Sequence, residues 1–324
     1  MNIPDEPHVE SYRGTLALVT GGAGFIGSHL VEALLAEGLR VRVVDNLVTG
    51  KAANLANVVD RIEFVDGDLA DFQVSERAVE GVSYVFHHAA IPSVPRSLAE
   101  PLESHRSGPT ATLNVLEAAR RAGVRRVIFA SSSSVYGDTE ELPKHEEMTP
   151  RPLSPYAVGK LAGEHYVGVY ARALGLDGIS LRYFNVFGPR QDPNSAYSGV
   201  IARFAKAIAQ GDRPVVFGDG LQTRDFTAVG NVVAANLAAL KSVKPLEGRA
   251  VNIGTGRRVS LLELVAKINQ LLGLNLRPLL EPPRLGDVRD SQADLSLAQK
   301  ILGYDPLIDF ETALTETLAD MGIE

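Results

Sequence analysis

Short apolar runs alternate with longer amphipathic stretches over the first 183 residues of the chain. The longer stretches follow a helical period and predict helices at residues 25–37, 112–122 and 156–174. The apolar runs predict strands at residues 16–20, 41–45, 61–66, 82–87, 126–131 and 177–183. Because strands that alternate with helices pair in parallel and are covered on both faces, this order predicts an α/β fold with a doubly wound parallel sheet.

The pattern becomes less regular beyond residue 185. It predicts helices from about 198 to 210, at 229–241 and at 260–272, and short strands at 214–218 and 250–253. We expect this half to form a smaller domain packed on the sheet. Because no repeat or low-complexity linker separates the halves, we expect two interwoven domains, one of residues 14–183 and about 225–254, the other of about 184–224 and 255–324.

Composition restricts the chemistry that is available. With 324 residues, of which 45% are hydrophobic, the chain can bury a large core. The absence of cysteine excludes disulfides, thiolate catalysis and cysteine-based metal sites, and agrees with a cytoplasmic location. The first 13 residues carry three carboxylates and no apolar run, so we expect a loosely ordered tail and neither a signal peptide nor a membrane anchor. A net charge of −7 argues against nucleic acid as a partner.

A glycine-rich loop follows the first predicted strand and opens the first predicted helix. Gly21, Gly24 and Gly27 stand three residues apart. Glycines allow a tight turn and close backbone approach, and the free N–H groups of a helix N-terminus bind phosphate, so the loop is a candidate site for a dinucleotide. Taken alone, it is explained equally well as a turn between a strand and a helix.

Polar or small residues mark the ends of the next three strands. Asp45 lies eighteen residues after the last loop glycine, where a carboxylate can accept hydrogen bonds from a ribose diol. With Asn46 and no arginine after it, the position favours NAD over NADP, although an Asp-Asn turn also explains the pair. Asp68 would face the adenine, and the small Ala89 and Ala90 would let the cofactor approach. The adjacent histidine pair has no third ligand at a metal-binding spacing, so we expect no metal site.

A tyrosine and a lysine, Tyr156 and Lys160, stand one helical turn apart and project from the same helix face. A lysine ammonium beside a phenol favours the phenolate, which otherwise forms only near about pH 10. The pair is therefore a candidate acid/base site. The pattern alone is more typical of an exposed pair on a surface helix.

Together these motifs resemble the extended short-chain dehydrogenase/reductase family, in particular its sugar-nucleotide epimerases. The resemblance covers nearly the whole chain and is carried by residues 21–27, 66–69, 131–137, 156–160, 182–185 and 224–226. It implies a Rossmann sheet domain that binds NAD and a smaller C-terminal substrate-binding domain that binds a UDP-sugar. It also implies a homodimer formed through the helices near 101–122 and 154–174.

The resemblance also assigns roles to single residues. Tyr156 would be the acid/base, Lys160 would hold the nicotinamide ribose and lower the pKa of the tyrosine, and Ser132 would hydrogen-bond the reacting hydroxyl. The implied cofactor-binding residues are Gly21, Gly24, Phe25, Ile26, Gly27, Asp45, Asn46, Asp68, Leu69, Ala89, Ala90, Tyr156, Lys160 and Tyr183. The implied substrate-binding residues are Ser93, Ser132, Ser133, Ser134, Asn185, Gln191, Gly199, Val200, Arg224, Arg289 and Ser291.

Two serines discriminate between the reactions of this family. The 4,6-dehydratases carry an Asp-Glu pair at the positions of Ser133 and Ser134, and the UDP-glucuronate decarboxylases carry a glutamate at the second. Without that acid/base, oxidation at C4 can only be reversed, so the resemblance implies a UDP-sugar 4-epimerase that keeps its NAD bound. The alternatives are a UDP-glucuronate epimerase or decarboxylase, a net NAD-linked oxidation, and a nucleotide-sugar-binding protein that has lost the chemistry.

One small side chain bears on the choice of sugar. Ser291 falls where hexose-only epimerases have a bulky tyrosine, so UDP-GlcNAc/UDP-GalNAc is expected along with UDP-Glc/UDP-Gal. Segments 191–194 and 286–291 resemble the epimerases for N-acetylated sugars. Three positions depart from the family, namely Pro92 in place of glycine, Gly108-Pro109 in place of a segment with asparagine, and Gly230 in place of aspartate.

Overall fold

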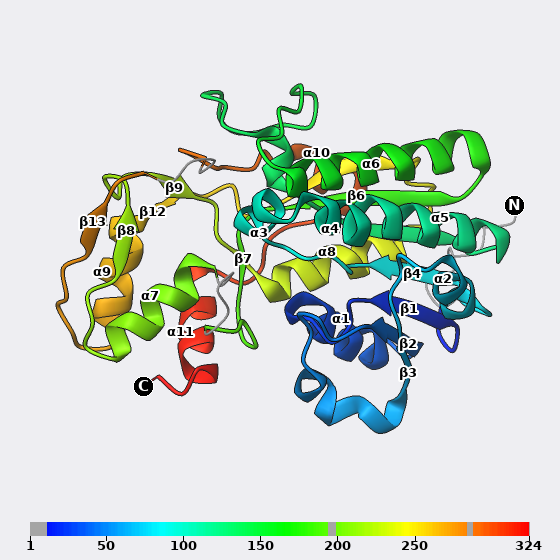
Figure 1. The fold of residues 1–324 in the computed structure, drawn as a ribbon, viewed down its shortest axis with the longest axis horizontal. Coiled ribbons are helices and arrows are strands. Elements are labelled where there is room, and N and C mark those ends of the chain that lie inside the picture. Colours follow the sequence, from blue (N-terminus) through cyan, green and yellow to red (C-terminus); the bar gives the residue numbers. More distant parts are fainter. Residues whose placement is uncertain (1–11, 194–198, 284–287, 324) are drawn as a thin grey trace, which may run out of the picture.

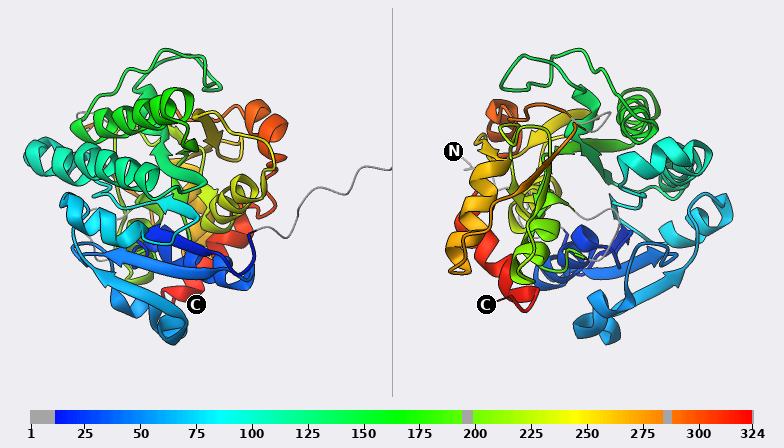
Figure 2. Two further views of the ribbon diagram at one scale, coloured as in Figure 1. Left: turned by 90° about the vertical axis from the view of Figure 1, so that its right-hand side faces the viewer. Right: turned by 60° about the vertical axis from the view of Figure 1, so that its left-hand side comes forward.

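A seven-stranded parallel sheet organises the fold (Figures 1 and 2). The computed structural model describes residues 12–193, 199–283 and 288–323. The strand order is β11-β6-β5-β4-β1-β2-β3, and each neighbouring pair is parallel. The strands are β1 (Leu16–Thr20), β2 (Arg40–Asp45), β3 (Ile62–Asp66), β4 (Tyr84–His87), β5 (Arg126–Ser132), β6 (Asp177–Tyr183) and β11 (Arg249–Ile253). The predicted α/β fold is confirmed.

Helices cover both faces of this sheet. One face carries α1 (Phe25–Ala36) and α8 (Val229–Lys241), and the other carries α2 (Phe72–Val79), α5 (Ala111–Arg121) and α6 (Pro155–Leu174). Both cores depend on the alternation of side chains along each strand. In β1, Ala17 and Val19 enter one core, whereas Leu16 and Leu18 enter the other.

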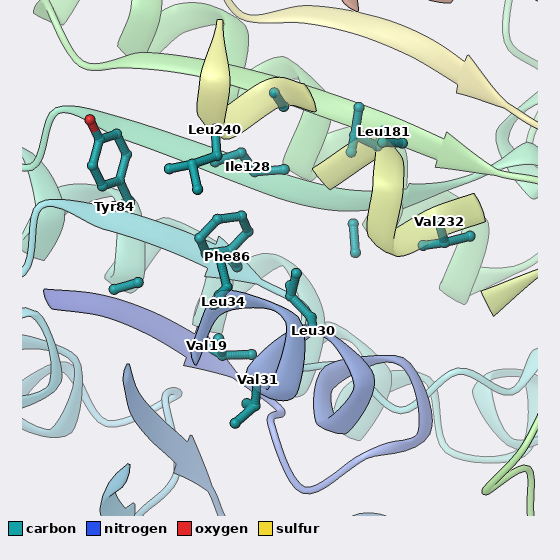
Figure 3. Close-up of a cluster of buried hydrophobic side chains, with 14 of the residues drawn as sticks. Val19, Leu30, Val31, Leu34, Tyr84, Phe86, Ile128, Leu181, Val232 and Leu240 are labelled. Atoms are coloured by element: carbon teal, nitrogen blue, oxygen red, sulfur yellow. The ribbon is translucent and has the colours of Figure 1, made fainter. Parts of the chain in front are cut away.

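The first core packs large side chains against the middle of the sheet (Figure 3). Leu30 and Leu34 of α1 meet Phe86 of β4, and Leu240 of α8 meets Ile128 of β5. Phe86 and Ile128 have no exposed surface, and neither have the two leucines of α1. Burying such side chains stabilises the fold by roughly 1.5–3 kcal/mol each.

A smaller body lies beside the sheet (Figure 1). Its core is shared by α7 (Val200–Ala209), α9 (Leu261–Leu271) and α11 (Phe310–Asp320). Short strand pairs surround it, namely β7 (Val186–Phe187) with β10 (Thr227–Ala228), β8 (Val215–Phe217) with β13 (Leu279–Glu281), and β9 (Thr223–Arg224) with β12 (Val259–Ser260).

One helix crosses the predicted domain boundary. α10 (Ser296–Leu302) belongs by sequence to the range 255–324, but its Ala298, and Tyr304 after it, pack into the first core of the large sheet. We propose the predicted division into two interwoven domains with this segment moved to the sheet domain. The structure brings it there because α10 packs against α8 and β11.

The predicted elements agree with the observed ones to within two residues at each end. The pattern does not predict the short helices α2, α3 (Val94–Ala99), α4 (Pro101–His105) and α10, nor α11, which has 11 residues. Most of these span two turns or fewer, too few for a period to emerge, and caps such as Asp71 before α2 and Asp309 before α11 set their starts. The expected N-terminal tail up to residue 11, together with Asn194, Gly286 and Asp287, lies outside the described residues. No helix in the described part of the chain is long and apolar enough to cross a bilayer.

Candidate active site

A cavity of about 890 Å³ lies at the carboxyl ends of the sheet strands and reaches to the smaller body. Open α/β sheets bind ligands at this edge, because the loops that follow the strands converge there. The predicted residues that line it are Gly21, Gly24, Phe25, Ile26, Gly27, Asp45, Asn46, Asp68, Leu69, Ala89, Ala90, Ser132, Ser133, Ser134, Tyr156, Lys160, Tyr183, Asn185, Gln191, Gly199, Arg224 and Ser291.

The glycine-rich loop forms the floor of the cofactor half. Gly21 has φ +65°, and a Cβ atom on Gly27 would come within 2.2 Å of the Gly21 carbonyl oxygen, so the fold itself requires both glycines. Gly24 caps α1 without a side-chain hydrogen bond. The N–H groups of the first turn therefore face the cavity and suit a diphosphate, which supports the predicted phosphate site.

Asp45 connects this loop to the end of β2. One carboxylate oxygen accepts a hydrogen bond from the Ala23 N–H at 3.0 Å, and the other accepts one from the Leu47 N–H at 2.8 Å. Burial raises the pKa of Asp45, and these two bonds oppose the rise. The carboxylate is fixed at the cavity wall with lone pairs that remain for a ribose diol.

We expect Asp45→Asn to weaken NAD binding about tenfold or more, because a hydrogen bond to a charged acceptor contributes about 1.5–3 kcal/mol. Isothermal titration with NAD, after any bound nucleotide has been removed from the protein, measures the change. The matched control is Asp60→Asn, an exposed aspartate outside the cavity, which should bind NAD as the wild type does. Equal affinity in both variants would contradict the role of Asp45.

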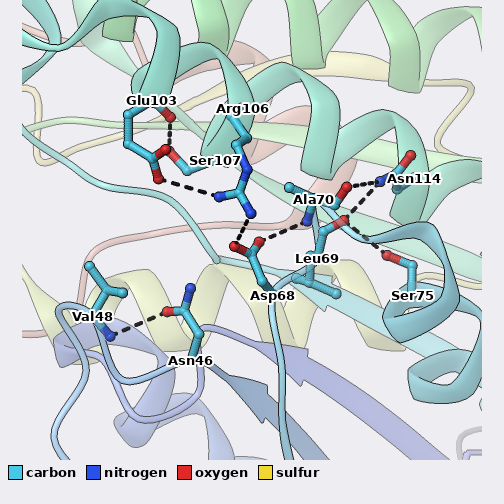
Figure 4. Close-up of polar contacts among 10 residues, drawn as sticks. All are labelled: Asn46, Val48, Asp68, Leu69, Ala70, Ser75, Glu103, Arg106, Ser107 and Asn114. Carbon is cyan, nitrogen blue, oxygen red and sulfur yellow. Dashed lines mark hydrogen bonds and ion pairs between the residues drawn. The ribbon is translucent and has the colours of Figure 1, made fainter.

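The predicted adenine end is held by a polar network that includes residues the sequence did not indicate (Figure 4). Asp68 accepts hydrogen bonds from Arg106 at 2.6 Å and from the Ala70 N–H at 2.9 Å. Asn114 of α5 donates to the carbonyls of Leu69 and Ala70. Asp68 is thus fixed by its neighbours at the edge of the cavity, and its contact with adenine stays a prediction.

Tyr156 and Lys160 face the cavity from the first turns of α6. The helix begins at Pro155, and the side chain of Ser154 accepts a hydrogen bond from the Ala157 N–H at 3.2 Å. Lys160 is buried, its ammonium lies 5.8 Å from the centre of the Tyr156 ring, and it donates to the Ala130 carbonyl at 2.6 Å. Since both residues line the cavity, the surface-pair alternative is wrong.

The pKa of the tyrosine differs from the expectation. Burial raises the pKa of Tyr156, and only the side chain of Ser132 lowers it again in part. The Lys160 ammonium lies over the tyrosine ring and donates to the Ala130 carbonyl. Burial also lowers the pKa of Lys160 itself to about 8, against the opposing charge of Glu164.

Of the paired histidines, His88 lines the cavity and His87 does not, and both are neutral residues. His87 bridges Thr20 at 2.8 Å and Thr112 at 3.0 Å, and His88 is 3.0 Å from the Tyr183 hydroxyl. Burial, followed by the charge of Lys160, lowers the pKa of each histidine to about 3. Within residues 12–193, 199–283 and 288–323, no group of three acidic or histidine side chains could hold a metal.

Two predicted residues meet in the substrate half of the cavity. The Asn185 amide donates to the Ser291 hydroxyl and to the Asp225 carbonyl, each at 3.2 Å. Two further wall atoms, the Ser134 hydroxyl oxygen and the Gln191 amide oxygen, are buried without a hydrogen-bond partner among the described residues. Buried polar atoms are normally paired, so these two atoms indicate a polar ligand.

Three predicted substrate residues do not line the cavity. Arg289 is exposed and forms an ion pair with Asp219 at 2.9 Å, so its charge points away from the site. Ser93 caps α3 by accepting a hydrogen bond from the Arg96 N–H at 3.1 Å. Val200 starts α7 and packs against the core of the smaller body.

A buried ion pair behind Lys160 was not predicted. Glu164, one turn after Lys160 on α6, accepts two hydrogen bonds from Arg182 at 2.9 and 2.7 Å and one from Ser131 at 2.5 Å. Arg182 continues to the Tyr136 hydroxyl at 2.9 Å. The spacing of Glu164 from Lys160 was the available signal, because residues four apart share one helix face.

The departures from the family pattern have local explanations. Gly108 and Pro109 lie in a π-helical segment, Arg106–Thr110, that continues α4 into α5, and Pro109 is buried against Gly159. Pro92 lines the cavity. A Cβ atom on Gly230 would come within 2.4 Å of Cδ1 of Ile308, so an aspartate there would require the end of that side chain to move.

Comparison with known proteins agrees with this geometry. The model of the NAD dependent epimerase/dehydratase family matches residues 17–254. The UDP-glucose 4-epimerase of Mycolicibacterium smegmatis is 41% identical, with 93% of this chain and 96% of the relative covered. Among solved structures, the chain is similar to a UDP-N-acetylglucosamine 4-epimerase from Methanobrevibacter ruminantium in complex with UDP-N-acetylmuramic acid (TM-score 0.90, 38% identity, 95% and 98% covered). It is also similar to the UDP-glucose 4-epimerase of Thermus thermophilus in complex with NAD (TM-score 0.85, 38% identity, 95% and 99% covered).

Proposed function

This chain belongs to the NAD dependent epimerase/dehydratase family, and from that premise we propose that it interconverts the C4 epimers of a UDP-sugar. It is an NAD-dependent enzyme. The observation that carries the proposal is the grouping of Ser132, Tyr156 and Lys160 at one cavity wall, with serines at 133 and 134 where a second acid/base would stand. A site with a single acid/base can remove the proton of the 4-hydroxyl and return it.

In this proposal, different residues of the chain accept the proton, orient the hydroxyl and stabilise the phenolate. The Tyr156 phenolate accepts the proton of the sugar 4-hydroxyl, and Ser132, which also interacts with the tyrosine, orients that hydroxyl. The buried Lys160 ammonium stabilises the phenolate. When bound, NAD supplies a hydride acceptor for C4 and returns the same hydride. The glycine-rich loop, Asp45 and Lys160 are the groups that would hold it.

We propose UDP-GlcNAc/UDP-GalNAc and UDP-Glc/UDP-Gal as the substrate pairs. The small Ser291, buried beside Asn185, leaves room next to the sugar for a 2-acetamido group. The unpaired Ser134 hydroxyl and Gln191 amide oxygen can hydrogen-bond sugar hydroxyls or the acetamido N–H. Arg224, which lines the cavity, suits the diphosphate of the nucleotide.

A substrate panel tests this proposal. The purified protein is incubated with UDP-GlcNAc, UDP-Glc or UDP-GlcA without added NAD, and the products are separated by chromatography. We expect the C4 epimer of UDP-GlcNAc or UDP-Glc with no net NADH. Loss of CO2, NADH formed in proportion to product, or no conversion of any of them would reject the epimerase.

The rate is expected to fall above about pH 8. Burial lowers the pKa of Lys160 to about 8, so the ammonium that stabilises the phenolate is lost as the pH rises through that value. In Lys160→Arg the guanidinium keeps its charge, and we expect a slower enzyme without this alkaline decline. The measurement is kcat as a function of pH from about 6 to 10, roughly the range over which a lysine with a lowered pKa and a tyrosine titrate. The same alkaline decline in both proteins would count against Lys160 as its source.

We propose a homodimer formed through α4, α5 and α6. These helices lie side by side, and Leu102, Val158 and Val169 on them are 86%, 52% and 49% exposed. Large exposed apolar side chains on adjacent helices are typical of an association surface. Leu102→Glu is expected to halve the mass in sedimentation, whereas Leu307→Glu, 83% exposed elsewhere, should not. A monomeric wild-type protein would refute the dimer.

A further inference from the structure

The loop after β7 is bound tightly to the helix that follows the glycine-rich loop. We call residues 188–192 of this loop the clasp segment. Arg190 donates to both carboxylate oxygens of Glu32 on α1, each at 2.7 Å, and the His29 ring donates to the Pro189 carbonyl at 2.9 Å. The Arg190 N–H also donates to Asp320 of α11 at 2.7 Å. Both α1 contacts are therefore made one or two turns from the predicted phosphate site.

The far end of the clasp segment is joined to the other side of the cavity. Asp192 forms an ion pair with Lys51 at 2.7 Å, and both residues line the cavity. The Lys51 N–H donates in turn to the carbonyl of Ala23, in the glycine-rich loop, at 2.9 Å. The Asn54 amide donates to the same carbonyl at 2.9 Å, so the Lys51 loop is itself fixed.

These contacts form a closed ring. It runs from the glycine-rich loop along α1 to Arg190, through Gln191 to Asp192, across to Lys51 and back to Ala23. Gly24 and Phe25, whose N–H groups begin α1, line the cavity inside this ring, as does Gln191. A diphosphate on the helix N-terminus would lie within it.

The backbone of the clasp segment is held in an uncommon conformation. Arg190 has φ +66°, a left-handed conformation that non-glycine residues seldom adopt. Its N–H, its side chain and the preceding carbonyl each have a partner that maintains the conformation. Such strain is retained where the surroundings over-determine the backbone, often at a ligand clamp.

We propose that the clasp segment retains the dinucleotide, with the Arg190–Glu32 pair as its anchor and the Asp192–Lys51 pair as its opening end. The Arg190 and Glu32 side chains are 21% and 30% exposed; in the other pair Asp192 is 28% exposed, but the Lys51 side chain is 54% exposed. The anchor is therefore shielded from salt, and the outer pair is the one that salt weakens. Release of the cofactor requires the Asp192–Lys51 contact to open. This proposal concerns retention of NAD and holds whichever sugar the enzyme converts.

The test measures the rate at which NAD leaves the purified holoenzyme at about 25 °C. Typical mesophile domains unfold only at about 45–65 °C, so the protein stays folded during the measurement. Holoenzyme is diluted, samples are passed through a desalting column over time, and the NAD that stays with the protein is quantified by enzymatic cycling. We expect Glu32→Gln to release NAD about tenfold faster, because Nη2 of Arg190, which donates to both oxygens of Glu32, loses its charged partner. We expect Asp192→Asn to release it several-fold faster and to abolish most of the acceleration that high salt causes in the wild type.

The matched control is Glu63→Gln. Glu63 pairs with Arg42 at 2.7 Å between β2 and β3, and neither residue lines the cavity. NAD release from this variant should equal that of the wild type. If Glu32→Gln releases NAD no faster than Glu63→Gln, the proposal is wrong. Should Glu32→Gln fail to fold, Asp192→Asn decides, because an unchanged release rate in that surface variant overturns the proposal as well.

Discussion

Tyr156→Phe is expected to lower kcat by about a thousandfold while binding NAD and UDP-sugar almost as the wild type does. The substitution removes one oxygen atom, and general acid/base catalysis by a positioned group contributes about 10²–10⁴-fold. Tyr156 lines the cavity with Ser132 and Lys160, so no neighbouring hydroxyl on α6 replaces it. Steady-state turnover and calorimetric titration of both ligands separate the loss of rate from a loss of binding.

The control is Tyr166→Phe, the same substitution on the same helix. Tyr166 packs against the core between α6 and the sheet and does not line the cavity. Its turnover should stay within about twofold of wild type, the scatter expected of a surface or peripheral change of about ±0.5 kcal/mol. Turnover by Tyr156→Phe at the rate of Tyr166→Phe would remove the tyrosine from the mechanism.

Glu164→Ala is expected to reduce the free energy of unfolding by about 3–5 kcal/mol, because it leaves the Arg182 guanidinium buried without its partner. Both side chains are only 5% exposed, and the carboxylate also accepts the Ser131 hydroxyl. Loss of this support would also loosen the end of β5, where Ser132 stands. Urea unfolding followed by circular dichroism gives the change in stability.

Glu117→Ala provides the comparison for an ion pair whose arginines are exposed. Glu117 pairs with Arg120 and Arg121 on α5, where its own side chain is 22% exposed and the two arginines are 38% and 54% exposed, and it also accepts a hydrogen bond from the Tyr170 hydroxyl at 3.1 Å. Exposed ion pairs contribute about 0–1 kcal/mol, so this variant should unfold near the wild-type midpoint. Equal losses for Glu164→Ala and Glu117→Ala would show that burial of the Glu164–Arg182 pair has no special consequence.

Features that depend on a few consecutive residues were predictable. The period of apolar residues located every strand of the large sheet, because a strand covered on both faces is a short apolar run wherever it occurs. The glycine spacing at 21, 24 and 27 and the Tyr156/Lys160 pair were equally accessible, since a tight turn and a shared helix face are local geometry. The order of these motifs also placed them at one edge of the sheet.

Electrostatic details at the site depended on distant segments. The pKa of Tyr156 is raised although the sequence predicts a lowered value, because folding buries the phenol and the Ser132 side chain offsets this only in part. Arg289 resembled a phosphate ligand but pairs with Asp219, 70 residues away in the chain. Arg106 and Asn114 were missed because only folding brings them to the end of β3.

The sequence by itself determined the class of fold, and it indicated the dinucleotide loop and the residues for which we propose the proton chemistry, because each is encoded in spacing along one strand, turn or helix. The tertiary structure alone decided which charges are satisfied and which face the cavity. Glu164 meets Arg182 across 18 residues, and Glu32 meets Arg190 across 158. Such pairs form because whole helices, strands and loops pack against each other. The spacing of hydrophobic residues within one element does not predict them.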